Sequence, residues 1–88
     1  MIIDQIKSLL LEKIDISKLD IIDETHKHHN HPQSNGGHFK MLIISEDFEG
    51  KTLIQRHKMI YNVLDSMIKK EIHALSINAR TPSEHVSS

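Results

Sequence analysis

The 88-residue chain has no cysteine and no tryptophan. Without cysteine it can form no disulfide framework, offer no thiolate nucleophile and build no four-cysteine zinc or iron–sulfur site of its own. Aromatic residues are also scarce, with one tyrosine and two phenylalanines, so the chain has few stacking platforms for single-stranded nucleic acid. Any chemistry that needs a soft sulfur ligand would therefore depend on a partner molecule.

A large excess of one charge is absent too. Eleven Lys and Arg residues stand against twelve Asp and Glu residues, which gives a formal charge of −1 when the histidines are neutral. That balance provides no electrostatic evidence for a nucleic-acid partner. The eight histidines, with an ordinary pKa of about 6.5, could make the chain net positive about one pH unit below neutral.

Long apolar runs and enzyme motifs are missing as well. Residues 1–14 carry four charged side chains among the apolar ones and lack a basic start, so they match neither a signal peptide nor a membrane span. Gly36-Gly37 does not lead a helix as a phosphate-binding loop would, and no serine or cysteine nucleophile motif is present. We therefore expect a cytoplasmic protein that has no membrane partner and is not an enzyme.

Apolar spacing and turn residues predict the secondary structure. Apolar residues recur every three or four positions in the first segment and again after Thr52, which is typical of amphipathic helices. Gly50 breaks the chain before Thr52, a residue suited to a helix N-cap, and Thr81-Pro82 suits the start of a short helical turn. The predicted elements are helices over 2–14 and 53–70 and strands over 19–23, 39–45 and 72–79.

The order of these elements predicts an α+β fold, α-β-β-α-β with a further helical turn, in one domain over residues 1–82. The last two strands are joined by a helix and should be parallel with a right-handed crossover, whereas the first two should be antiparallel. The result is a three-stranded mixed sheet covered on one face by helices. Residues 83–88 are expected to fray. The connector over residues 25–38 is long for so small a domain, which makes it a candidate working surface.

Five of the eight histidines lie in the 25–38 connector. Imidazole is a good ligand for zinc, copper, iron and nickel. The spacing, however, fits no closed zinc-finger pattern, and a polar connector that contains glycine can also be a solvated connection. Both interpretations stay open for this loop, whose histidines are His26, His28, His29, His31 and His38.

Two more histidines lie in predicted regular elements. His57 falls on the apolar stripe of the second helix, where a single histidine is expected to be a packed core residue. His73 opens the last strand, where an imidazole could stay near the sheet edge and remain reachable. The predicted buried stripe comprises Leu53, His57, Ile60, Tyr61, Leu64 and Ile68.

Basic side chains gather at the start of the second helix. Lys51, Arg56 and Lys58 could contact phosphates. A solvated helix face explains the same pattern. The slightly negative net charge favours the solvated face.

Several stretches together resemble the BolA family. The resemblance covers residues 9–82, and its specific part is the order and spacing of F-x-G-K at 48–51, R-H-K at 56–58 and I-H-A-L at 72–75. It implies an α+β fold similar to the type II KH module, in agreement with the element order read from periodicity. The matching stretches are HFKMLIIS, FEGKTLIQRHKMIYNVL and IHALSINARTP, with DETHKHHNH similar to the family's first-strand and loop region.

The resemblance implies an adaptor that binds a monothiol glutaredoxin and shares a bridging 2Fe-2S cluster with it, in iron–sulfur trafficking or iron sensing. The family's ligands are a histidine that opens the last strand, matching His73, and a loop residue, which falls on His28 or, with the loop gap placed differently, His29. The glutaredoxin cysteine and a bound glutathione would supply the thiolates. The isolated chain would then hold no cofactor. When free, it is expected to be a monomer.

The resemblance also implies an alternative function, because some bacterial members are described as DNA-binding transcriptional regulators of stress response and cell shape. In that case Lys51, Arg56 and Lys58 would contact phosphates. The chain lacks the Gly-x-x-Gly loop through which a KH domain clamps a nucleic-acid backbone. It also has Ser83-Glu84-His85-Val86 where family members commonly carry a tryptophan soon after Thr-Pro, which puts a docked terminal helix in doubt.

Overall fold

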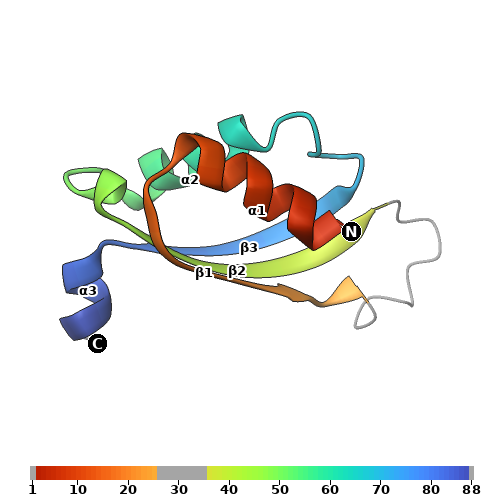
Figure 1. Cartoon of the computed structure of the whole chain (residues 1–88). Helices are drawn as coiled ribbons and strands as arrows, with labels where there is room; N and C mark the ends of the chain where they lie inside the picture. The colour runs from red at the N-terminus through yellow and green to blue at the C-terminus, as the bar shows by residue number, and fades with distance from the viewer. Residues whose placement is uncertain (1, 26–35, 88) are drawn as a thin grey trace.

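The computed structural model describes residues 2–25 and 36–87. Figure 1 shows one sheet with two helices lying along it and a short helix at the C-terminal end. Most element boundaries lie close to those expected, although β1 begins three residues earlier than predicted. In chain order the elements are α1 (Ile2–Lys13), β1 (Ile16–Asp23), β2 (Gly37–Ser45), the 3-10 turn η2 (Glu46–Phe48), α2 (Leu53–Val63), β3 (Ile72–Arg80) and α3 (Pro82–Ser87).

The sheet has three strands in the order β1-β2-β3. β1 and β2 are antiparallel, and β2 and β3 are parallel. Helices α1 and α2 cover one face of this sheet (Figure 1). The predicted mixed three-stranded sheet with helices on one face is therefore confirmed.

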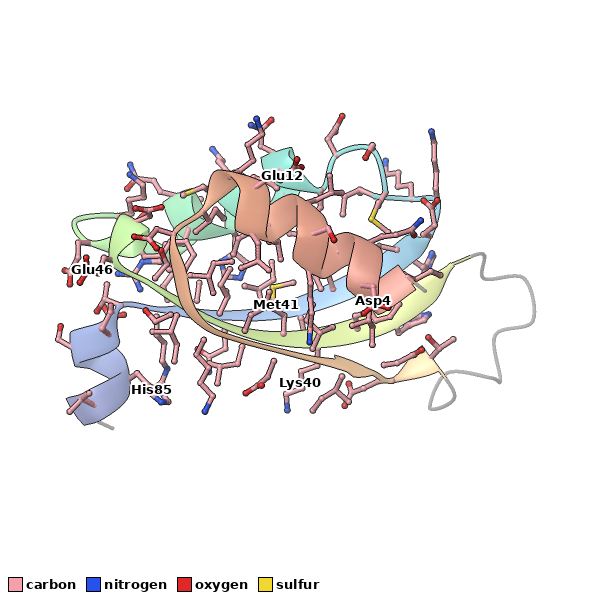
Figure 2. The ribbon with its side chains drawn as sticks, in the orientation of Figure 1. Asp4, Glu12, Lys40, Met41, Glu46 and His85 are labelled. Carbon is pink, nitrogen blue, oxygen red and sulfur yellow. The ribbon has the colours of Figure 1, made fainter. Side chains whose placement is uncertain are left out.

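The core lies between the sheet and the two long helices. Alternating residues of β2, including Met41 and Ile43, are buried on the side of the helices, because successive side chains of a strand point to opposite faces. Figure 2 shows Met41 between the sheet and α1, with Lys40 on the other side. Ile6 and Leu10 of α1 complete this packing and are fully buried.

Helix α2 begins as predicted and ends earlier than predicted. The hydroxyl of Thr52 accepts a hydrogen bond from the N–H of Gln55, and the Gln55 side chain accepts one from the N–H of Thr52. This reciprocal pair confirms Thr52 as the N-cap. The helix ends at Val63 and is followed by turns in which Lys69 has a positive φ of 68°, a conformation that a continuous helix cannot contain.

The buried face of α2 also differs from the predicted stripe. Arg56 and Ile60 are the buried residues of the helix, whereas Leu53 and Tyr61 are exposed and His57 is half-buried. Ile60 and Leu64 of the predicted stripe are buried as expected, but the buried face is shifted toward Arg56. The reason is that Arg56, predicted to face solvent, points into the protein toward partners on β3 and α3.

Helix α3 extends over residues that were expected to fray. Glu84 anchors it, since both carboxylate oxygens accept hydrogen bonds from the guanidinium of Arg56, at 2.7 and 3.1 Å. The same Glu84 accepts from the N–H of Thr81, and the Thr81 hydroxyl accepts from the N–H of Glu84. This capping box and ion pair dock the terminal helix without a tryptophan.

No helix within the two described segments is long and apolar enough to cross a membrane.

Candidate functional site

His73 lies in an irregularity at the start of β3. Gly37 of β2 pairs with Ile72, but the next residue, His38, pairs with Ala74. Two steps on β3 therefore match one step on β2, and His73 is the extra residue. A bulge of this kind redirects a side chain and breaks the alternation of faces, so His73 does not simply continue the face of Leu75 as its sequence position suggests.

The ring of His73 is exposed and lies beside a second imidazole. The ring centroids of His73 and His38 are 5.0 Å apart, and the ring planes are inclined by 51°. His73 is exposed, whereas His38 is half-buried and its Nε2 atom is shielded from solvent. The His73 imidazole is therefore reachable from solvent and lies against the half-buried ring of His38.

Two glycines allow β2 to approach the turn that precedes His73. A Cβ atom on Gly36 would lie 2.2 Å from the main-chain oxygen of Lys70, and Gly36 has a φ of 87°. A Cβ atom on Gly37 would lie 2.6 Å from the Phe39 ring. The N–H of Gly37 donates to the main-chain oxygen of Glu71 at 2.8 Å. Only glycine fits at position 36 against the main chain of this turn, and the close approach of β2 places His38 near His73.

The predicted loop ligands His28 and His29 lie outside the described residues, as do His26 and His31. Among residues 2–25 and 36–87, no group of three or more His, Asp or Glu side chains is placed to hold a metal ion. His73 and His38 together therefore supply too few ligands for a closed site. A metal at this end of β3 would need donors from elsewhere.

The basic residues at the start of α2 do not form one exposed set. Arg56 is only 5% exposed. Its guanidinium donates to the main-chain oxygens of Ala79 and Lys51, each at 3.0 Å, in addition to Glu84. The pKa of Glu84 is lowered to about 2, first by the hydrogen bonds from Arg56 and then by the N–H of Thr81. Arg56 thus serves as a structural anchor, which corrects its assignment as a phosphate contact, while Lys51 and Lys58 remain exposed.

One exposed side of α2 carries apolar residues. Leu53 is 64% exposed and Ile54 is 68% exposed. Tyr61 continues this face, and its hydroxyl donates to the main-chain oxygen of Leu75 at 3.3 Å. Leu53, Ile54 and Tyr61 line one shallow hollow, and Tyr61 contacts β3, the strand that carries His73. Exposed apolar groups that gather in this way are typical of protein-contact surfaces.

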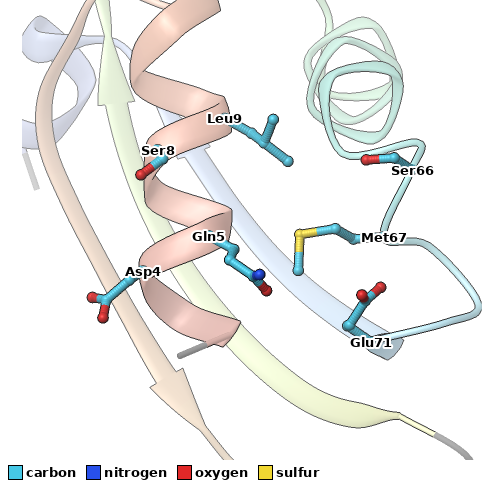
Figure 3. A pocket seen from close by; sticks show the side chains of 7 residues that line it. All are labelled: Asp4, Gln5, Ser8, Leu9, Ser66, Met67 and Glu71. Carbon is cyan, nitrogen blue, oxygen red and sulfur yellow. The ribbon is translucent and has the colours of Figure 1, made fainter.

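A separate pocket of about 550 Å³ opens between α1 and the turn before β3. In Figure 3, Gln5 and Leu9 point from α1 toward Met67 and Glu71, whereas Asp4 points away from them. The pocket combines apolar and polar walls but does not bring histidine or lysine side chains together. We assign no chemistry to it. Its lining comprises Asp4, Gln5, Ser8, Leu9, Ser66, Met67 and Glu71.

Comparison with known proteins identifies the family. The sequence matches the BolA-like protein family over residues 10–84. The chain belongs to the BolA-like family. It is 39% identical over 82 residues to a BolA-like protein of Dictyostelium discoideum, covering 92% of this chain and 71% of that protein.

Solved structures share the fold of this BolA-like chain. The BolA domain of SufE1 from Arabidopsis thaliana superposes with a TM-score of 0.82 and 37% identity, and the match covers 92% of each chain. A further relative is the DNA-binding transcriptional regulator BolA of Escherichia coli, which is 35% identical over 66 residues, or 75% of this chain and 62% of the regulator. The predicted family and the α+β fold with its mixed sheet are therefore confirmed, and the similarity to the type II KH module stays a prediction.

His73 was predicted from the sequence as a candidate ligand, whereas His38 was not singled out among the connector histidines. Two signals were available. Gly36-Gly37 stands immediately before an apolar strand, which can mark close approach of two backbones, and His38 is the histidine of the connector that adjoins this strand. Neither signal shows that β3 carries an extra residue at His73, because strand register depends on the assembled sheet.

Proposed function

We propose that this BolA-like chain acts in the cytoplasm as an adaptor that binds a monothiol glutaredoxin and shares a bridging 2Fe-2S cluster with it. The observation that carries the proposal is the exposed imidazole of His73, set on a bulge of β3 in a chain without thiols. An imidazole is a good iron ligand. The sulfur ligands would come from the glutaredoxin cysteine and a bound glutathione.

One proposed ligand, His73, lies in β3, and the other lies in the connector between β1 and β2. His73 would bind through one ring nitrogen, and a loop histidine, His28 or His29, would supply a second. Imidazole ligands in place of thiolates lower the negative charge at an iron atom, which raises the reduction potential of a cluster. We expect the shared cluster to be reduced more readily than the cluster of a glutaredoxin homodimer, as measured by redox titration of both species.

The exposed apolar residues on one side of α2 support a protein partner. Leu53, Ile54 and Tyr61 leave hydrophobic surface in water on the β3 side of the molecule. Burying such surface stabilises a complex. Tyr61 contacts the main chain of β3 at Leu75, two positions from His73, so a partner on this surface would lie against the strand that carries His73.

The test is titration of the chain into cluster-loaded monothiol glutaredoxin, followed by visible absorption and circular dichroism. The native chain should change the spectrum to that of a histidine-ligated cluster, and His73→Ala should abolish the change. His85→Ala is the matched control, because His85 lies on α3, which follows the opposite end of β3 from His73, and it should behave like the native chain. An identical spectrum for native protein and His73→Ala would contradict the proposal.

The alternative is nucleic-acid binding, which the names of bacterial relatives favour, including the DNA-binding transcriptional regulator BolA of Haemophilus influenzae. Here Lys51 and Lys58 would contact phosphates. Arg56 would not take part, because its donors are used inside the protein. In gel shifts across salt concentrations, a steep salt slope that Lys51→Ala and Lys58→Ala each reduce by about one would support this alternative.

A further inference from the structure

His38 stands next to the proposed iron ligand, and its Nε2 atom is closed to iron from solvent. Its Nε2 atom is buried, whereas the His73 side chain is exposed. Their ring centroids are 5.0 Å apart, which is the range of direct aromatic contact. We propose that His38 is a positioning residue, whose ring forms a wall that limits the orientations of the His73 ring. This inference rests on the proposed function and adds a role to the same site.

The backbone under His38 is held from the side of β1. Its N–H donates to the Thr25 hydroxyl oxygen at 3.0 Å, and its main-chain oxygen accepts from the N–H of Glu24 at 2.7 Å. Thr25 is itself held, because its hydroxyl and its N–H both donate to Asp23 Oδ1. The wall is therefore attached to a network of hydrogen bonds rather than to one side chain.

The backbone is held from the side of β3 as well. The N–H of the preceding residue, Gly37, donates to the main-chain oxygen of Glu71, two positions before His73. A side chain at Gly37 would meet both the Phe39 ring and the Thr25 hydroxyl. The absence of a side chain at Gly37 thus lets the two sets of hydrogen bonds form together, and His38 is fixed relative to the turn that leads into His73.

His73 needs such a wall because of its position. It lies in an irregular step at the start of β3, an edge strand of the three-stranded sheet. A strand residue at a bulge has fewer regular neighbours to restrict its side chain. Ordering a ligand before it binds lowers the entropic cost of binding. A wall at His38 therefore makes His73 a better ligand without touching the metal.

The first experiment compares His38→Ala with His38→Phe in the cluster-bridged complex with glutaredoxin. Alanine removes the wall, so cluster loss to a chelator should become about 3- to 10-fold faster. Phenylalanine keeps a flat ring without nitrogen and should restore a rate within about twofold of native, since contact with the ring face needs no nitrogen. An unchanged rate in His38→Ala, or a rate in His38→Phe as fast as in His38→Ala, would overturn the positioning role.

A control separates positioning from loss of general stability. Leu19 is half-buried on β1 and packs against the core opposite Ile43, away from the histidine pair. Leu19→Ala should lower the thermal midpoint without accelerating cluster loss at a temperature where all variants are folded. Acceleration by Leu19→Ala equal to that by His38→Ala would show a stability effect and overturn the inference.

The second experiment uses the free chain and needs no cluster. Nuclear Overhauser contacts should join the ring protons of His38 and His73 in the native protein, and ring relaxation should show an ordered His73. His38→Ala should increase the motion of the His73 ring, and His38→Phe should restore its order. Equal His73 motion in native protein and His38→Ala would overturn the inference. If instead the rings are ordered but native protein accepts no cluster, the proposed function fails while the pairing of the two rings stands.

Discussion

The two ends of β3 carry polar groups in opposite conditions. At the end near Arg80, Arg56 and Glu84 satisfy one another and the guanidinium also binds the main-chain oxygen of Ala79. At the end near Ile72, the imidazole of His73 is exposed and lies against His38. We call the end near Arg80 the closed end, because its charged side chains pair with one another. We call the end near Ile72 the open end, because the His73 imidazole is exposed to solvent there.

This difference separates anchoring from binding within one small domain. A buried cation whose hydrogen-bond partners lie inside the protein stabilises the fold and is not presented to a ligand. An exposed imidazole contributes little to stability and is available to a partner. Residue type alone gave the opposite expectation for Arg56, which was grouped with the exposed basic residues. Burial and hydrogen-bond partners distinguish the two roles.

The largest expected effect is at the closed end. Arg56→Met keeps an unbranched apolar stem but removes the donors to Ala79, Lys51 and Glu84. The free energy of unfolding should fall by about 3 kcal/mol, because the buried main-chain oxygen of Ala79 and the part-buried one of Lys51 lose their charged donor. Urea denaturation measures the change. A loss below about 0.5 kcal/mol would place Arg56 with ordinary surface residues.

A smaller loss is expected from crowding the open end. Gly36→Ala places a Cβ atom against the main-chain oxygen of Lys70 and forces alanine into a positive φ. The free energy of unfolding should fall by about 2 kcal/mol. Gly50→Ala is the matched control, because Gly50 has a φ of 75° but no atom within 4 Å of its Cβ position. Gly50→Ala should lower the free energy of unfolding by only about 1 kcal/mol, from backbone strain. Equal losses in Gly36→Ala and Gly50→Ala would show that the contact between position 36 and Lys70 adds nothing.

Acid should weaken the closed end selectively. The pKa of Glu84 is lowered from its ordinary value of 4.5 to about 2 by Arg56 and Thr81. A carboxyl group with a lowered folded-state pKa contributes stability that is complete above about pH 4.5 and is lost as the pH falls toward 2. The thermal midpoint of native protein should therefore approach that of Glu84→Gln across this range. A gap between the two that stays constant down to pH 2 would contradict the ion pair.

The smallest effect on stability is expected for His73→Ala. The side chain is exposed, so its removal should change the free energy of unfolding by less than about 0.5 kcal/mol. The same variant should abolish cluster sharing with glutaredoxin. Denaturation and spectral titration of one sample measure both. A loss of stability as large as that of Arg56→Met would make His73 an anchor as well, and the contrast between the two ends would disappear.

Local patterns predicted much of this fold and part of its site. Apolar periods predicted the two long helices and the strands, and the Thr52 cap was predicted from its position before an apolar helix. The T-P-S-E sequence at residues 81–84 also contains a capping-box pattern, a signal for α3 that the missing tryptophan obscured. His73 was predicted to be reachable from its place at the start of a strand, and it is exposed.

The amino-acid sequence by itself therefore determined the element order, the helix caps, the mixed sheet and the absence of any thiol ligand, because these depend on neighbouring residues or on composition. Only the tertiary structure decided that Arg56 is buried and that His38 lies beside His73. Arg56 meets Glu84 across 28 positions of sequence, and the histidine pair depends on an extra residue in the register of β3. Such contacts depend on how whole helices and strands pack and on the register of the strands. The local spacing of apolar residues carries no information about either.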